Sequence, residues 1–234
     1  CIRDRADLTL VDASAVELPS LTLTGNLSVT TAGAITDSGT LAVTGTSTLA
    51  AGSGNSITLY TTTNNFTGAV LVSSGSDVTL VDRNALVLGA SSVSGYLDVT
   101  TSGSISDSGA LAITGTSPLA AGAGNHITLN TTSNNFIGAV LITSGNDVTL
   151  VDADALLLGA STVSGSLTVT VTLGDITDTG TLDVTGDASF TANASGSDIV
   201  LDDTSNRFGG AVAFVSSGGL ADLTFVDTTA VELP

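Results

Sequence analysis

The segment ADLTLVDASAVELP, residues 6–19, returns as ADLTFVDTTAVELP at residues 221–234. Eleven of the 14 positions are identical, although the two copies lie 215 residues apart. Two looser copies stand between them, SDVTLVDRNALVLG from Ser76 and NDVTLVDADALLLG from Asn146. A segment that recurs at such a spacing predicts an array of structural repeats.

The aspartate that precedes each copy of this segment divides the chain into units of about 70 residues. The second half of a unit repeats as well, because GSGNSITLYTTTNNFTGAVLVSSG from Gly52 is matched by GAGNHITLNTTSNNFIGAVLITSG from Gly122. A third copy, from Ala194, differs by small insertions. We interpret the chain as one rod and expect it to be a segment of a longer array. The units are residues 7–76, 77–146 and 147–221, with the start of a fourth at 222–234.

Apolar residues alternate with polar ones in short bursts, such as Leu97 and Val99 or Ile127 and Leu129. This period of two predicts strands of four to six residues, and Ser-Gly and Thr-Gly pairs between the bursts predict turns. About nine bursts in a unit indicate about three coils of about 23 residues each. The pattern therefore predicts an all-β chain folded as a three-faced parallel β-solenoid, with a β-sandwich as the alternative.

The composition favours the solenoid over the sandwich. The chain has 27 glycines, 3% aromatic residues and no tryptophan, and only 11% of its residues are charged. A solenoid needs one small inward side chain above another in every coil, whereas large compact domains usually carry more aromatic residues. We therefore expect a core made of small aliphatic side chains.

The net charge of −18 excludes some classes of partner. Four arginines stand against 22 acids, so a nucleic-acid backbone or an anionic membrane surface would be repelled. The chain contains no apolar run near the roughly 20 residues that a membrane-spanning helix needs. We expect a soluble protein with no nucleic acid as partner and no membrane insertion.

The single cysteine, Cys1, excludes an internal disulfide framework. We take it as an arbitrary chain start, with the lipid-bearing first residue of a bacterial lipoprotein as the alternative.

Six stretches of the chain carry a resemblance to a known family: LTVT, GDITDTGTLDVTG, GNHITLN, NNFIGAV, NDVTLVDADALLLGAS and VSGSLTVT. They resemble the repeats of large secreted bacterial adhesins of the filamentous-haemagglutinin-like type, exported by two-partner secretion. The resemblance implies a right-handed parallel β-helix outside the cell, working as an adhesive or structural fibre. The NPNG-like and NPNL-like motifs of that family's secretion domain are not found in these residues, so recognition by a transporter is not assigned to them.

Candidate catalytic residues are few, and we expect no enzyme. The only histidine, His126, aligns with Ser56 of the preceding unit, and no serine or cysteine constellation can be built around it. The doublet Asp202-Asp203 resembles the paired carboxylates of pectin-cleaving β-helices. The histidine-glycine and basic motifs of those enzymes are missing, and neighbouring strand residues point to opposite faces.

Calcium is the one cofactor that the acids suggest, because Asp12, Asp82, Asp152 and Asp227 recur after the same strand. Equivalent positions would lie three coils apart, on the order of 14 Å, whereas calcium needs six to eight oxygens within about 2.6 Å. We therefore expect these residues in Asx turns or solvated corners and predict no resident cofactor. Asp202 and Asp203 remain weak candidates for a calcium site.

The motif Asn-Asn-Phe at residues 64–66 recurs at 134–136 and becomes Asn-Arg-Phe at 206–208. A sugar-binding site is one interpretation. We favour a corner in which the phenylalanine fills the coil interior and the glycine that follows, Gly68, Gly138 or Gly210, lets the next strand turn away.

Together these patterns predict a stiff structural and adhesive segment of a giant extracellular fibre at the bacterial cell surface. Its expected partners are further copies of its own repeats, in the same chain or end to end, and cell-surface glycans or proteins. One alternative is a carbohydrate- or calcium-dependent binding module in the more divergent third unit. The other is a filament subunit that stacks end to end.

Overall fold

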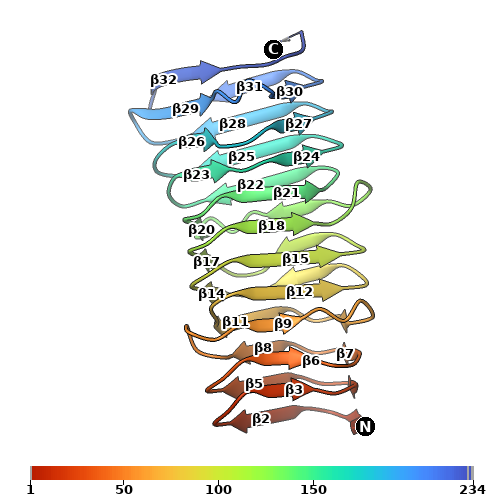
Figure 1. The fold of residues 1–234 in the computed structure, drawn as a ribbon. Coiled ribbons are helices and arrows are strands. Elements are labelled where there is room, and N and C mark those ends of the chain that lie inside the picture. The colour runs from red at the N-terminus through yellow and green to blue at the C-terminus, as the bar shows by residue number, and fades with distance from the viewer. Residues whose placement is uncertain (1, 231, 233–234) are drawn as a thin grey trace.

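Parallel strands stack along one axis into a β-solenoid of about ten coils of about 21 residues (Figure 1). The computed structural model describes residues 2–230 and 232, and in these residues it has 32 strands and no helix. All pairings between these strands are parallel, which excludes the sandwich and confirms the all-β parallel β-helix. In Figure 1 the near strands run to the right and the far strands to the left as the chain rises, so the coil is right-handed. Cys1 lies outside the described residues.

Two long sheets form the broad faces of the rod. The back sheet, on the far side in Figure 1, has eleven strands. They are β2 (Leu8–Asp12), β5 (Leu27–Thr31), β8 (Ser47–Ala50), β11 (Val70–Ser74), β13 (Leu86–Leu88), β16 (Ile105–Asp107), β19 (Ile127–Leu129), β22 (Val148–Asp152), β25 (Leu167–Val171), β28 (Ala188–Ala192) and β31 (Val212–Val215).

The front sheet also has eleven strands and faces the viewer in Figure 1. They are β3 (Val16–Leu18), β6 (Ile35–Asp37), β9 (Ile57–Leu59), β12 (Val78–Asp82), β15 (Leu97–Thr101), β18 (Ser117–Ala120), β21 (Val140–Ser144), β23 (Leu156–Leu158), β26 (Ile176–Asp178), β29 (Ser197–Leu201) and β32 (Leu220–Phe225).

Three short sheets close the narrow edges of the coil, one for each repeat. The first consists of β1 (Ile2–Arg5), β4 (Leu21–Leu23), β7 (Leu41–Val43) and β10 (Asn65–Phe66). The second consists of β14 (Ser91–Val93), β17 (Leu111–Ile113) and β20 (Asn135–Phe136), and the third of β24 (Ser161–Val163), β27 (Leu182–Val184) and β30 (Arg207–Phe208).

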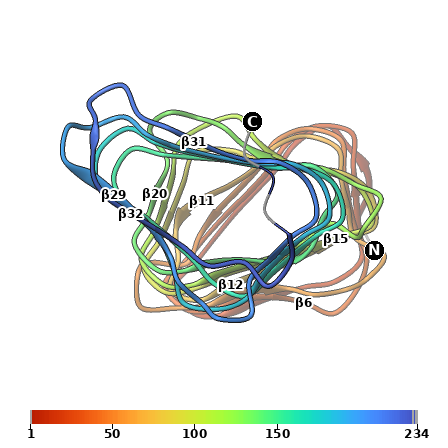
Figure 2. The ribbon, with the colours of Figure 1, turned by 90° about the horizontal axis from the view of Figure 1, so that it is seen from above.

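The edge sheets alternate between the two sides of the rod. In Figure 1, β7 and then β24, β27 and β30 lie on the right, whereas β14, β17 and β20 lie on the left. The first strands of successive repeats, β2, β12, β22 and β32, alternate in the same way. β2 and β22 lie in the back sheet, and β12 and β32 lie in the front sheet. Consecutive repeats are therefore related by about half a turn around the long axis, seen end-on in Figure 2.

The half-turn arises because a repeat contains half a coil more than the three coils that the sequence predicts. Leu8 pairs with Leu27, Leu27 with Ser47 and Ser47 with Val70, which completes three coils of 19 to 23 residues. The strand β11 then leads into β12 without an edge strand between them. At about 4.8 Å per coil, one repeat rises by about 17 Å.

Alternating burial explains why these residues form strands. In β5, Leu27 and Val29 are fully buried while Thr30 is exposed, and the same pattern recurs in strand after strand. The interior is built of leucine, valine and isoleucine, as the composition predicts. Phe66, Phe136 and Phe208 are each 1% exposed, which confirms that the corner phenylalanines fill the interior. Among the described residues, no helix is long and apolar enough to cross a membrane.

Candidate functional site

The recurring aspartates after the first strand of each repeat do not share one environment. Asp82 and Asp152 are buried, at 1% and 0% exposure, whereas Asp12 is exposed and Asp227 is half-buried. Of the two expected settings, Asx turns and solvated corners, Asp82 and Asp152 adopt the first, and the Asn-Asn-Phe corner of the preceding repeat binds them away from solvent.

Each buried aspartate joins two repeats through its two carboxylate oxygens. In Asp82, Oδ2 accepts the backbone N–H of Phe66 at 2.6 Å and Oδ1 accepts that of Asn84 at 2.7 Å. The second bond is an Asx turn, as the sequence predicts. In Asp152, the same oxygens accept the N–H groups of Phe136 and Asp154, both at 2.7 Å.

Burial raises the pKa of the Asp82 and Asp152 carboxyls above their ordinary value, although the accepted N–H groups pull each pKa down. The exposed Asp12 carboxylate differs, because its Oδ1 accepts the N–H and the hydroxyl of Ser14 at 2.8 and 2.7 Å. These two bonds lower the pKa of the Asp12 carboxyl.

The first asparagine of each corner is fully buried, as Asn64, Asn134 and Asn206. In Asn134, Oδ1 accepts the N–H of Leu111 at 2.9 Å, and Nδ2 donates to Asp107 Oδ2 at 2.7 Å. Asp107 also accepts the N–H groups of Asn130 and Thr131, both at 3.1 Å. Asn64 makes the equivalent bonds to Leu41 and Asp37. Asn206 makes them to Leu182 and Asp178.

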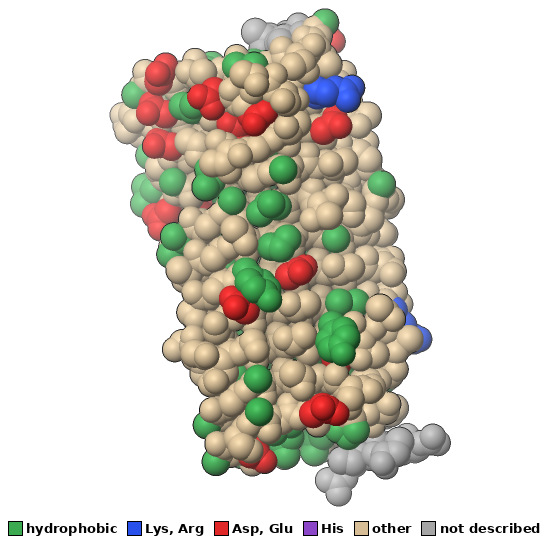
Figure 3. Space-filling model, viewed as in Figure 1, with side chains coloured by type: hydrophobic (Ala, Val, Ile, Leu, Met, Phe, Trp, Pro, Cys, Tyr) green, Lys and Arg blue, Asp and Glu red, His purple; other side chains and the backbone are tan. Residues whose placement is uncertain are grey.

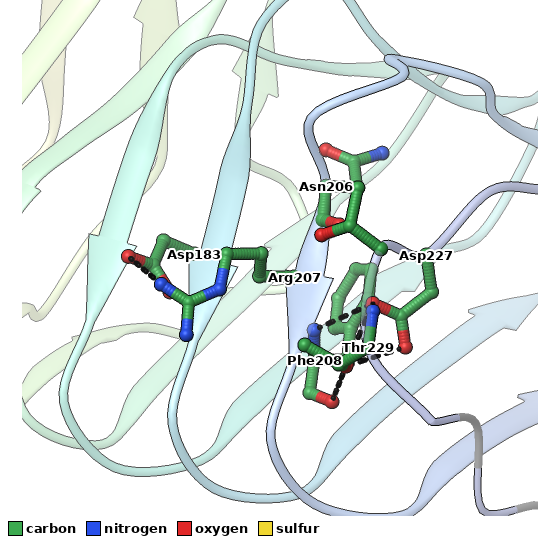
Figure 4. A network of polar contacts seen from close by, with 7 residues as sticks. Asp183, Asn206, Arg207, Phe208, Asp227 and Thr229 are labelled. Atoms are coloured by element: carbon green, nitrogen blue, oxygen red, sulfur yellow. Dashed lines mark hydrogen bonds and ion pairs between the residues drawn. The ribbon is translucent and has the colours of Figure 1, made fainter.

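The third corner carries a variation, shown in Figure 4. Asp227 Oδ1 accepts the N–H of Phe208 at 3.2 Å and that of Thr229 at 2.9 Å. Arg207 stands where the other repeats have Asn65 and Asn135, and its guanidinium lies 3.8 Å from Asp183 Oδ2. Both side chains of this ion pair are about half exposed, so it contributes about 0–1 kcal/mol.

We call this arrangement the corner staple. It consists of the buried asparagine, the aspartate that ends the Ile-x-Asp strand below it, and the aspartate at or just after the end of the next repeat's first strand, such as Asn64, Asp37 and Asp82. Its carboxylate and amide oxygens accept backbone N–H groups at 2.6–3.2 Å. Chemically it fixes a backbone corner, which supports the structural interpretation of the Asn-Asn-Phe motif. Our reading of the sequence missed Asp37, Asp107 and Asp178, whose signal is their constant place at the end of an Ile-x-Asp strand.

The glycines after the corners have a different role from the predicted one. A Cβ at Gly138 would collide with the backbone of Gly115 in the coil below. These glycines therefore allow close stacking of successive corners, and the left-handed backbone region is occupied elsewhere, at Gly52 and Gly122.

The weak calcium candidates lie in the turn after β29. Asp202 is exposed, and its N–H donates to Asp178 Oδ1 at 3.0 Å. Asp203 Oδ1 accepts the N–H of Ser205 at 2.9 Å. Within residues 2–230 and 232, no three His, Cys, Asp or Glu side chains form a group that could hold a metal ion.

His126 lies just before β19. Its side chain is exposed, and its Nδ1 lies 3.3 Å from Oδ2 of Asp147, which is exposed to a similar degree.

Comparison with known protein families matches three stretches of the chain, residues 5–73, 75–143 and 145–215, to the family described as repeats of unknown function (DUF5649). No curated protein and no solved structure matches the chain.

Proposed function

Because the chain belongs to the family of repeats of unknown function (DUF5649), we propose a function that stacked repeats can perform: a stiff structural and adhesive segment of an extracellular fibre at a bacterial cell surface. The observation that carries the proposal is the continuity of both broad sheets across every boundary between repeats. The cell-surface location and the adhesive role rest on the resemblance of the repeats to secreted adhesins.

Continuous pairing supports stiffness. At the first boundary, β12 pairs with β9 of one repeat and with β15 of the next, and β22 does the same between β19 and β25. Bending the rod there would break backbone hydrogen bonds and open a core in which Leu80 and Leu150 are 1% exposed.

The corner staples support it further, since Asp82 and Asp152 each bind the preceding repeat. A hinge between two repeats would leave a buried carboxylate and a buried N–H without partners, at a cost of about 1–3 kcal/mol for each group. The repeats should therefore move as one body.

The outside of the rod supports diffuse contact in place of one deep site. Large exposed apolar side chains, such as Tyr60 and Ile137, are scattered, and most of the visible surface is neither apolar nor charged (Figure 3). The excess of acids keeps neighbouring rods apart. Such a surface suits weak, repeated contacts with cell-surface glycans or proteins.

Solution scattering tests the stiffness. Ten coils at about 4.8 Å predict a particle about 50 Å long, and each further repeat should add about 17 Å. A maximum dimension that does not grow with the number of repeats would overturn the rod.

The surface role is tested with an antibody against this chain on intact cells of its source and with beads that carry the chain. Absence of both cell labelling and bead attachment would overturn the adhesive role alone.

A further inference from the structure

The outward side of the back sheet carries no charge, although the net charge of the chain is −18. We call it the neutral face, defined as the outward-pointing described residues of the back-sheet strands, from Thr9 in β2 to Val215 in β31. All of them are serine, threonine, alanine, valine or leucine. The three acids within these strands, Asp12, Asp107 and Asp152, each stand at the last position of a strand, on the inward side of the alternation.

The front sheet has acids at outward positions. Glu17, Asp98 and Asp198 alternate outward from β3, β15 and β29. Acidic side chains are accordingly spread over the face that Figure 3 shows. The half-turn between repeats assigns corresponding strands to opposite faces, so the two broad faces have a similar construction and a different charge.

The neutral face is regular along the rod. Thr128 pairs with Thr149, Thr149 with Thr168 and Thr168 with Ser189. Their outward hydroxyls therefore form a ladder with a spacing of about 4.8 Å. Such a ladder of small side chains offers a broad surface to a partner.

The size of the neutral face matches what a stable pair of proteins needs. Its eleven strands stack over about 50 Å, and strands of three to five residues are about 10–17 Å wide. Covering the face would bury about 500–850 Å² on each of two rods, or about 1,000–1,700 Å² in total, and specific interfaces bury about 1,200–2,000 Å². The edge sheets, with three or four short strands each, are too small for this.

The charge distribution favours a second copy of this chain as the partner. Facing sheets pack about 10 Å apart, which is about one Debye length at 0.1 M salt, so acids on facing sheets repel one another. Two front faces would bring Glu17, Asp98 and Asp198 to that distance, whereas two neutral faces bring no charge there. The methyl groups of threonine and valine and the side chain of Leu71 would leave water as the pair forms.

We propose that this chain pairs side by side with a second copy of itself through the neutral face. The interface is isologous, so the same residues of both rods face each other. The acids of the two front sheets then point away from the interface on both sides, and their repulsion stops the association at a pair. This pairing goes beyond the function proposed above and rests on the rod, not on its adhesive role.

The half-turn between repeats supplies matched variants for a test. Thr128 and Thr149 pair on the neutral face, and Thr58 and Thr79 pair in the same way on the front face, in strands of the same sequence, ITL and VTLVD. All four side chains are half-buried. The double variant Thr128→Glu, Thr149→Glu places acids on the neutral face, and Thr58→Glu, Thr79→Glu adds the same charge to the front face. All chains carry Cys1→Ser, so that no disulfide can join them.

Sedimentation equilibrium measures the Kd of the pair. We expect the neutral-face variant to raise Kd at least about tenfold, because like charges that face each other across an interface oppose binding. The front-face variant should change Kd less than about threefold. Equal effects of the two variants, or a chain that stays monomeric at about 1 mM, would overturn the pairing. Circular dichroism confirms that each variant is folded.

Two measurements on the chain with Cys1→Ser alone test the arrangement without these variants. Side-by-side pairing keeps the maximum dimension in solution scattering near about 50 Å, whereas association end to end would about double it and overturn the pairing. Raising the salt concentration should lower Kd, because salt screens the repulsion between two acidic rods. A Kd that rises with salt would show that charged contacts hold the pair, and it would also overturn the neutral face as the interface. Monomeric rods whose length grows with the number of repeats would keep the proposed function and lose only the pairing.

Discussion

Gly159 packs against Leu141 of the preceding coil so closely that a Cβ at Gly159 would stand 2.5 Å from Leu141 Cγ. Gly89 and Leu71 are related in the same way one repeat earlier. In the third repeat, Ala213 stands where the others have Leu71 and Leu141, and the sequence at the place of the glycine has Pro234, which lies outside the described residues. In both described pairs a leucine below thus goes with a glycine above.

This relationship predicts a coupled pair of substitutions. Gly159→Ala should lower the free energy of unfolding by about 1–3 kcal/mol, because the new methyl overlaps the branched Cγ of Leu141, which must shift to make room. In a Leu141→Ala background the same change should cost less than about 0.5 kcal/mol. A double-mutant cycle by urea unfolding measures the coupling, and a coupling energy near zero would contradict the packing argument.

The buried asparagine of the corner staple should be among the most sensitive polar positions. Asn134→Ala leaves the Leu111 N–H and one bond of Asp107 without a partner, so we expect a loss of about 2–5 kcal/mol. Asn135→Ala is the matched control, because this neighbour makes one exposed bond to Asp154 and should cost under about 1 kcal/mol. Similar losses for both variants in urea unfolding would argue against the staple.

The buried carboxyls predict an unusual dependence on pH. Because burial raises the pKa of Asp82 and Asp152 above the ordinary value of 3.8, the native state binds more protons than the unfolded state at pH values around and above 3.8. The free energy of unfolding should therefore be highest below that value and fall as the pH rises through the native pKa. Thermal unfolding between pH 4 and 8 measures this.

Salt provides the control for the pH prediction. Relief of the general repulsion among 22 acids also favours the folded state at low pH, but salt screens that contribution far more than the buried one. The pH dependence of the free energy of unfolding that persists at about 1 M salt should be smaller in the double variant Asp82→Asn, Asp152→Asn. An unchanged high-salt pH dependence in this variant would assign the effect to other groups.

The alternation of apolar and polar residues and the spacing of the repeats were sufficient to predict strands, parallel coils and buried corner phenylalanines. A period of two can be recognised within one strand, without knowing which strands lie beside it. They could not predict the half-turn between repeats. The strand after Asp7 and the strand after Asp77 have the same pattern, yet one lies in the back sheet and the other in the front sheet. Which sheet a strand joins depends on the length of the coil before it, and that length is set by turns whose sequences all look alike.

The sequence pattern could not predict the burial of Asp82, for a similar reason. Its cover is the corner around Phe66, whose N–H it accepts from 16 residues away, and the distance along the chain does not reveal that contact. A signal was present, since each Asn-x-Phe corner is followed by such an aspartate in the next repeat. The structure shows that the two motifs form one staple.

Two serines in the core predict a gain in stability. Ser47 and Ser117 are fully buried, and neither hydroxyl has a hydrogen-bond partner. The third repeat has Ala188 at the same place in the strand ladder. Removing an unsatisfied hydroxyl should therefore raise the free energy of unfolding, by about 0.5–1.5 kcal/mol for Ser47→Ala and by the same amount for Ser117→Ala. The two gains should add, because the sites are far apart.

Ser91→Ala is the control and should lower the free energy of unfolding, because the Ser91 hydroxyl accepts Val72 N–H at 3.0 Å and donates to the Gly89 carbonyl at 2.8 Å. Urea unfolding of the three variants decides the matter, and destabilisation by Ser47→Ala would mean that its hydroxyl has a partner in solution.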